Sequence, residues 1–238
     1  MRYRISEKIL VKYPSFFRIV VFAKNIDNTK PAIPELEALL AVQSDLIRKN
    51  NGMQLKHPRV AKWVNVYNEC GINTLQNVPS IYSLLSRKQN GKKLPFISPI
   101  VAILNLTSIS YLLPCGGIDA TTVQGDLELG YSNGNETFLP LGKSKKEPMS
   151  PGEIIYYDSG NKNVICRSWN SKSGQPTMIQ KSTNSTIIDL DAFEETAPRE
   201  LVLDTANYMV SLVEKYCRGT CTIDILSYEQ PELTVSGV

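Results

Sequence analysis

The sequence predicts an α+β fold, a layered sandwich of β-sheets and helices that forms a single domain over residues 1–238. Segments with helical periodicity dominate residues 34–112, and segments with strand character follow between 126 and 190. An amphipathic pattern then runs from about 198 to 216, which is typical of a helix that covers a sheet. No repeat, low-complexity tract or long linker divides the chain. Helices, then strands, then a covering helix is the order of an α+β protein.

The N-terminal third is expected to contain two strands and three helices. Residues 9–11 and 17–23 are rich in β-branched and aromatic side chains, which favours strands. The helices are expected to begin at Pro34, Pro58 and Ser80, because proline or a hydroxyl residue before an apolar stripe marks a helix start.

A fourth helix, over Ser98–Leu112, is expected to be the buried centre of the fold. The run between Lys93 and Asp119 carries no formal charge, and its apolar positions surround the helix almost completely. Gly116-Gly117 follows and is expected to form a turn, since glycines accept unusual backbone angles. We expect this turn to line the main cavity.

The second half is expected to form strands. Residues 126–131 alternate in polarity, and a turn at 132–135 predicts a hairpin with 137–139. Residues 153–157 and 164–169 are expected to pair around another short turn. The remaining expected strands are 186–190 and 220–227.

Composition excludes several classes of protein. Apolar residues make up 42% and charged residues 21%, values of an ordinary globular domain. The five cysteines form no CxxC pair and only one histidine is present, which argues against a zinc site and for a reducing compartment. No apolar run fits a membrane span, and the N-terminus lacks a signal-peptide pattern. We therefore expect a cytoplasmic protein with no metal, no cofactor and no membrane partner.

The net charge of +3 is unevenly distributed. Residues 1–93 hold 16 Lys and Arg against 6 Asp and Glu, whereas residues 94–238 hold 10 against 17. A basic half is compatible with a polyanionic partner such as RNA, and the alternative is that the solvated helices are simply rich in lysine. The residues expected to contact RNA are Arg59, Lys62, Arg87, Lys88, Lys92 and Lys93.

The usual catalytic motifs are absent: the sequence contains no GxSxG, phosphate-binding glycine loop or HExxH. His57 stands at a predicted helix start, where capping is a better explanation than catalysis. Cys115 is expected to be a buried apolar residue rather than a nucleophile. The catalytic residues are therefore left unassigned.

Three polar clusters are candidates for ligand binding, each with a structural alternative. Asn105 lies on the apolar helix, where its alternative role is to satisfy buried backbone groups. The amides of the Gly-Gly segment, beside Asp119, could hold a carboxylate or carbonyl or simply end the helix. Trp169, Asn170 and Lys172 stand at a strand end, where the indole ring could stack on a base.

Several segments together resemble a known family across nearly the whole chain. They are HPRVAKWVNVYNECG, SIYSLLSRKQNGKKLPFISPIVAILNLTSISYLLPCGGID, GDLELGY, FLPLG, PGEIIYYD, CRSWNSK and KYC. This pattern resembles stand-alone relatives of the tRNA-binding and editing domain of the phenylalanyl-tRNA synthetase beta subunit, formed by its third and fourth modules. The resemblance implies a compact α/β fold with a pocket that, in the synthetase, hydrolyses mischarged tyrosyl-tRNA.

The resemblance extends to some of the synthetase's site residues and not to its editing residues. Asn105, Pro114 and Asp119 match an Asn, a Pro and an Asp of the synthetase motif. Gly116 stands where that motif has its editing His, and Leu104 where it has a Thr. The position of its editing Glu is near Gln175 or Pro176, neither of which is acidic.

These observations predict a cytoplasmic protein that binds tRNA or aminoacyl-tRNA, with deacylation of mischarged tRNA as an open further activity. The alternative is a non-catalytic pocket protein that binds a free amino acid or another small metabolite. Neither the amino acid nor the oligomeric state follows from the sequence. The residues expected to bind the substrate are Asn105, Pro114, Gly116, Gly117, Asp119, Trp169, Asn170 and Lys172.

Overall fold

The computed structural model describes residues 1–50, 52–92 and 94–235, and in these segments the helices lie largely where the sequence predicts them. The helices from Pro34, Pro58 and Ser80, the buried central helix and the C-terminal amphipathic helix are all present. The helices are α1 (Glu7–Lys12), α2 (Pro34–Lys49), α3 (Pro58–Glu69), α4 (Ser80–Gln89), α5 (Pro99–Tyr111) and α6 (Arg199–Cys217), with short 3-10 helices η1 (Met53–Lys56) and η2 (Ala120–Thr122).

The strands form two sheets. Sheet A has the order β12-β1-β4-β7-β8-β5-β6, with β9 paired to β8, and sheet B has the order β11-β2-β10-β3. The strands are β1 (Arg2–Ile5), β2 (Phe16–Lys24), β3 (Cys115–Asp119), β4 (Leu127–Tyr131), β5 (Thr137–Phe138), β6 (Glu147–Pro148), β7 (Ile154–Asp158), β8 (Asn163–Arg167), β9 (Lys172–Ser173), β10 (Ser185–Phe193), β11 (Thr220–Leu226) and β12 (Glu232–Thr234).

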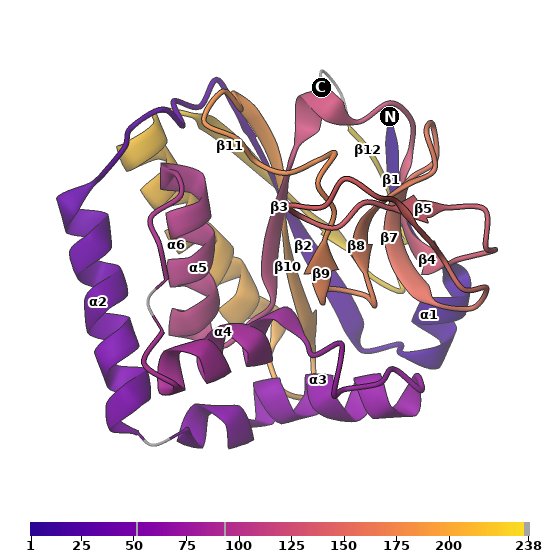
Figure 1. Cartoon of the computed structure of the whole chain (residues 1–238), viewed down its shortest axis with the longest axis horizontal. Helices are drawn as coiled ribbons and strands as arrows, with labels where there is room; N and C mark the ends of the chain where they lie inside the picture. The colour runs from indigo at the N-terminus through magenta and orange to yellow at the C-terminus, as the bar shows by residue number, and fades with distance from the viewer. Residues whose placement is uncertain (51, 93, 236–238) are drawn as a thin grey trace.

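Sheet B lies between the helices and sheet A. Helices α5 and α6 pack on one face of sheet B, α2 packs outside α5, and sheet A lies on the opposite side (Figure 1). Helices α3 and α4 run beneath these layers in the same view. The largest cluster of buried apolar side chains draws on the helices and on both sheets. The layered α+β architecture is thus confirmed, while the single domain over 1–238 stays a prediction.

The central helix α5 is almost fully buried, as its uncharged sequence predicts. Ile100, Ile103, Leu106 and Ile109 are each 3% exposed or less. The helix ends because Leu112 adopts a left-handed backbone conformation (φ 57°). Helix α5 contacts α2, α6 and strand β3, and these contacts position the start of β3.

Three local predictions are wrong, each for a physical reason. Residues 9–11 belong to helix α1, in which Ile9 and Leu10 are buried and Val11 is exposed, a pattern that no strand alternation gives. The turn at 132–135 does not form a hairpin, because β4 is already paired on both sides, by β1 and β7. Gly116-Gly117 is not a turn but part of strand β3, paired with β10.

Candidate functional site

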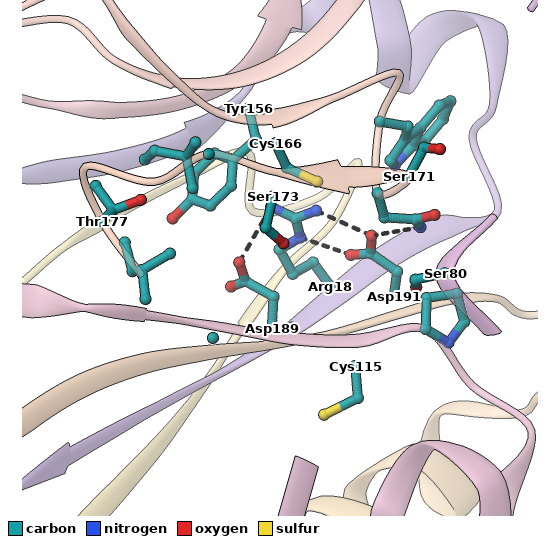
Figure 2. Close-up of a pocket in the computed structure, with 18 of the residues that line it drawn as sticks. Arg18, Ser80, Cys115, Tyr156, Cys166, Ser171, Ser173, Thr177, Asp189 and Asp191 are labelled. Carbon is teal, nitrogen blue, oxygen red and sulfur yellow. Dashed lines mark hydrogen bonds and ion pairs between the residues drawn. The ribbon is translucent and has the colours of Figure 1, made fainter. Parts of the chain in front are cut away.

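A pocket lies between the two sheets, beside the edge strand β3. Its volume is about 100 Å³, which exceeds the space needed by a single water. Sheet B contributes side chains from β2 and β10, and sheet A contributes Tyr156 from β7 and Cys166 from β8 (Figure 2). The segment from Trp169 to Met178 closes one side, and Ser80 reaches the pocket from the start of α4.

The floor of the pocket is a buried ion cluster on sheet B. Arg18 of β2 pairs with Asp191 of β10 through two hydrogen bonds, Nε to Oδ1 at 2.6 Å and Nη2 to Oδ2 at 2.9 Å. Its third nitrogen, Nη1, donates to the hydroxyl of Tyr3 at 2.6 Å and lies 3.5 Å from Asp189 Oδ2. Arg18 and Asp191 are each 2% exposed. Such a pair retains its charges in the interior only because its donors are satisfied.

Asp189 is the least satisfied member of the cluster. Its Oδ1 atom has no hydrogen-bond partner among the described residues, and neither does the hydroxyl of Tyr156 across the pocket. Burial raises the pKa of Asp189 to about 6, with the charge of Arg18 acting in the opposite direction. A carboxyl group that titrates near neutrality inside a pocket is typical of a functional site.

A strained turn positions Asn170 at the pocket wall. Ser168 and Trp169 both have positive φ angles (49° and 66°), a conformation that costs energy for residues other than glycine. Tyr67 of α3 holds this turn: its hydroxyl bonds to the Ser168 carbonyl at 2.6 Å and to Asn170 Oδ1 at 2.8 Å. Asn170 Nδ2 in turn donates to Asp191 Oδ2 at 3.2 Å. The turn therefore connects the wall to the ion cluster.

The two glycines of β3 face opposite sides of sheet B. Gly116 pairs with Asp189, and a Cβ atom at Gly116 would meet no other atom within 4 Å. A Cβ atom at Gly117 would lie 2.9 Å from Leu104 Cδ1, on the helix side. Their amides also diverge, because Asp191 N bonds to Pro114 O and strand alternation turns the Gly116 amide toward β10 and the Gly117 amide toward the open edge. The predicted pair of free turn amides is therefore wrong.

A family model for the B3/4 domain matches residues 62–218, more than half of the chain. The chain belongs to the B3/4 domain family. This match confirms the resemblance to the domain of the phenylalanyl-tRNA synthetase beta subunit that the sequence motifs indicate.

One solved structure similar to this B3/4 domain is an N-terminal fragment of the phenylalanyl-tRNA synthetase beta subunit from Pyrococcus horikoshii. The two sequences are 11% identical, and the TM-score is 0.48. The match covers 92% of this chain and 49% of the fragment, so the chain spans about half the length of that structure. No curated protein matches this chain in sequence.

Only some of the predicted substrate-binding residues of this B3/4 domain line the pocket. Trp169 forms a wall with its ring fully buried against Phe16 and Trp63, which leaves no open face for stacking on a base. The predicted residues that line the pocket are Pro114, Gly116, Gly117, Trp169 and Asn170.

The other three predicted residues lie outside the pocket lining. Asn105 is on α5, which packs on the far side of sheet B. Asp119 accepts bonds from Thr121 and Thr183, so it closes the turn at η2. Lys172 is exposed and stands at the rim, between two residues that do line the pocket. Their role in binding stays a prediction.

None of the described basic residues predicted to contact RNA lines the pocket, and their contact with RNA stays a prediction. Arg59 donates to the Tyr111 carbonyl at the end of α5 (2.8 Å), and Lys62 pairs with Glu195 (2.6 Å). Arg87 is exposed, while Lys88 and Lys92 line a separate groove beside α2. Lys88 is also about 12 Å along α4 from Ser80, the end of that helix at the pocket. Lys93 lies outside the described residues.

His57 takes the structural role predicted for it, whereas Cys115 is only partly buried and is among the residues that line the pocket. His57 caps α3, where its Nδ1 accepts a bond from the Arg59 amide at 3.3 Å. The thiol of Cys115 lies 4.0 Å from the sulfur of Met209 in α6, on the side of β3 away from the ion cluster (Figure 2). His57 does not line the pocket, and burial raises the pKa of the Cys115 thiol, which therefore stays protonated at neutral pH.

Sequence reasoning missed Arg18, Tyr156, Asp189 and Asp191, which form the centre of the site. A signal existed: Arg18 interrupts the apolar strand FFRIVVFA, and the two aspartates stand two positions apart in IIDLDAF. Residues two apart on a strand point to the same face, and charges in a buried strand require partners.

Among the described residues, no three His, Cys, Asp or Glu side chains gather in an arrangement that could hold a metal ion. None of the helices in the described segments is both long and apolar enough to span a membrane.

Proposed function

We propose that this B3/4 domain binds aminoacyl-tRNA, with the aminoacyl group in the pocket between the sheets. The observation that carries the proposal is the pocket itself: a cavity with a charged, partly unsatisfied floor in a chain of this family. A buried carboxylate without full compensation costs stability, and such costs are retained where a ligand uses the group. The resemblance to the tRNA-binding domain of the synthetase supports tRNA as the carrier of that ligand.

Exposed lysines on a loop attached to the pocket wall, together with Lys172, support a polyanionic partner. We define the rim lysines as Lys143, Lys145, Lys146 and Lys172, all exposed and without an ion pair to any described residue. The loop that carries the first three is fixed to the pocket wall, because Pro140 pairs with Gly174 and the Gly142 amide donates to Gln175. Flexible, unpaired ammonium groups on such a loop fit a phosphate backbone.

In addition to binding, we propose that the pocket can hydrolyse the ester bond between the amino acid and the tRNA. The pocket contains carboxylates, hydroxyls and two thiols but no imidazole. Burial raises the pKa of both thiols, so a bound water oriented by polar groups would have to act as the nucleophile. The rival function is binding of a free amino acid or small metabolite in the same pocket. This rival requires the pocket and does not require the rim lysines.

The test is to compare the affinity of the purified protein for aminoacyl-tRNA and for the same tRNA without its amino acid, at low salt. We expect the aminoacylated form to bind more tightly, because only that form fills the pocket. Amino acid released during the same incubation reports hydrolysis. Equal affinity for both forms would contradict a role of the pocket in tRNA recognition, and no tRNA binding at low salt would favour the free amino acid.

A further inference from the structure

The ion cluster at the pocket floor has a net charge of one negative unit. The cluster holds two carboxylates, Asp189 and Asp191, against a single guanidinium, Arg18. Arg18 is committed to Asp191, because its Nε and Nη2 atoms form the bidentate pair at 2.6 and 2.9 Å. Its remaining approach to Asp189 is the longer contact of 3.5 Å. The uncompensated charge therefore resides on Asp189, at the edge of the cavity.

Two buried oxygen atoms of residues that line this cavity have no hydrogen-bond partner in the described part of the chain. Asp189 Oδ1 comes from sheet B and the Tyr156 hydroxyl from sheet A, and Figure 2 shows the two side chains on opposite sides of the same space, beside Arg18. Asp189 is 8% exposed and Tyr156 is 3% exposed. Buried polar atoms in folded proteins almost always have a hydrogen-bond partner. A bound cation with N–H donors would give both oxygen atoms a hydrogen-bond partner and would also neutralise the net negative charge of the cluster.

We propose that the pocket floor is a binding site for a primary ammonium group, held between Asp189 Oδ1 and the Tyr156 hydroxyl. An ammonium has three N–H donors and no acceptor, so it can serve both oxygens at once. In an aminoacyl ester or a free amino acid, the α-ammonium is that group. The inference deepens the proposed function by naming the chemical group that the pocket recognises. It rests on the proposed function only for the identity of the molecule that carries this ammonium group.

The groups around Asp189 leave it as the titrating member of the site. Burial raises the pKa of the Tyr3 and Tyr156 hydroxyls well above their usual value, and it raises the pKa of the Cys166 thiol to about 12. These groups, from β1, β7 and β8, therefore stay protonated at neutral pH. Arg18 from β2 stays charged and is paired with Asp191 from β10. The ammonium should consequently bind more tightly as pH rises through about 6, with release of a proton from Asp189.

The experiment uses the full chain and ethylammonium chloride as the probe, at constant ionic strength and above pH 6. Binding is followed by the NMR signals of the backbone amides and of the two indole N–H groups, since Trp169 lines the pocket. A probe of three heavy atoms binds no more tightly than about 1 mM, so the titration extends through the millimolar range. We expect saturable shifts centred on the pocket, and no saturable shift with neutral ethanol or with tetramethylammonium, which has no N–H donor.

Two substitutions separate the ammonium site from a general effect on folding. Asp189→Asn should weaken ethylammonium at least about tenfold, because a charged hydrogen bond is lost. Tyr156→Phe should weaken it by a smaller factor. The matched control is Tyr157→Phe on the same strand: the Tyr157 hydroxyl bonds to Glu128, it does not line the pocket, and binding should be unchanged. Thermal melting confirms that each variant is folded.

The outcomes distinguish this inference from the proposed function. Absence of saturable binding in the wild type, equal binding of tetramethylammonium, or full binding by both the Asp189 and Tyr156 variants would overturn the ammonium site, even if tRNA still binds. Ethylammonium binding that is lost in Asp189→Asn and weakens below pH 6 would support it, even if no tRNA binds.

Discussion

Gly116 of β3 and Asp189 of β10 lie directly opposite each other in the antiparallel ladder, on the face of sheet B that borders the pocket. Opposed Cβ positions on such a ladder are about 5 Å apart, so any side chain at position 116 would stand beside the carboxyl group. The absence of a side chain at Gly116 is therefore what leaves Asp189 open to the cavity. Neither glycine of β3 has a positive φ angle, so space and not backbone geometry explains Gly116.

Filling this space should abolish ligand binding without unfolding the protein. Gly116→Val places a β-branched residue in a strand, where such residues are favoured, and its Cβ atom meets no neighbour within 4 Å. We expect the melting temperature to be maintained or raised, and binding of ethylammonium and of the aminoacyl group to be lost. Calorimetry and the NMR titration measure the two effects separately.

The neighbouring glycine provides the matched control. Gly117→Val would place its Cβ atom 2.9 Å from Leu104 Cδ1 and 3.0 Å from Ile179 Cδ1, inside the packed core. Overpacking of this kind costs about 1–3 kcal/mol. Severe destabilisation by Gly116→Val together with tolerance of Gly117→Val would show that the two faces of β3 have been assigned in reverse.

Asp189 should lower the stability of the protein at neutral pH. Its pKa rises from 3.8 to about 6 on folding, so the native state binds more protons than the unfolded state between these pH values. Below about pH 4 the Asp189 carboxyl is protonated in the native state and does not lower the free energy of unfolding. The free energy of unfolding then decreases as pH rises through 6, because the buried carboxyl must ionise. The free energy of unfolding of Asp189→Asn should therefore equal that of the wild type near pH 4 and exceed it by up to about 3 kcal/mol above pH 6.

Urea unfolding of both proteins across this pH range measures the difference. A variant that is less stable than the wild type at neutral pH would mean that Arg18 holds the Asp189 carboxylate more strongly than burial disfavours it. The wild type should also gain stability when ethylammonium is added above pH 6, because the bound cation offsets the buried charge.

The helices could be predicted from the sequence because their signals are local. Pro34, Pro58 and Pro99 each stand in the first turn of a helix, and the apolar stripe that follows fixes the buried face. Local preference predicts a turn at the Gly-Gly segment, because two glycines usually interrupt regular structure. Pairing with β10, about seventy residues away in the chain, overrides that local preference.

The centre of the site could not be predicted in the same way. Arg18 and Asp191 meet because β2 and β10 pair in one register out of many, and the sequence carries no local record of that register. Tyr156 joins them from the other sheet. The sequence could have indicated that charged residues in buried strands need partners, but only the sheet order identifies which partners they find.

His57 should contribute to stability and not to ligand binding. His57→Ala removes the acceptor for the Arg59 amide at the start of α3, and loss of a helix cap costs roughly 0.5–1 kcal/mol. Burial and the charge of Arg59 lower the pKa of His57, so the neutral ring is the form that the fold favours. The contribution of His57 to the free energy of unfolding should be present above about pH 6.5, and it should disappear as pH falls below this value and the ring becomes protonated.

Thermal melting of the wild type and of His57→Ala, above and below about pH 6.5, tests whether the stabilisation by His57 is lost at low pH as expected. Ethylammonium binding should be the same in both proteins, since His57 does not line the pocket. A large loss of binding would place His57 in the site after all.

The last prediction concerns which lysines bind tRNA. Replacing the four rim lysines by glutamine should weaken tRNA binding and flatten its salt dependence, because fewer counterions are released. The slope of log affinity against log salt should fall by about 0.7–0.9 for each phosphate contact removed. The matched control is Arg87→Gln with Lys92→Gln, two exposed cations of the predicted helical set that lie away from the pocket. Ethylammonium binding should be maintained in both variants, because none of these side chains lines the pocket floor. If the control variant loses tRNA binding and the rim variant does not, the RNA surface lies on the basic helices, as the charge asymmetry of the sequence alone suggested.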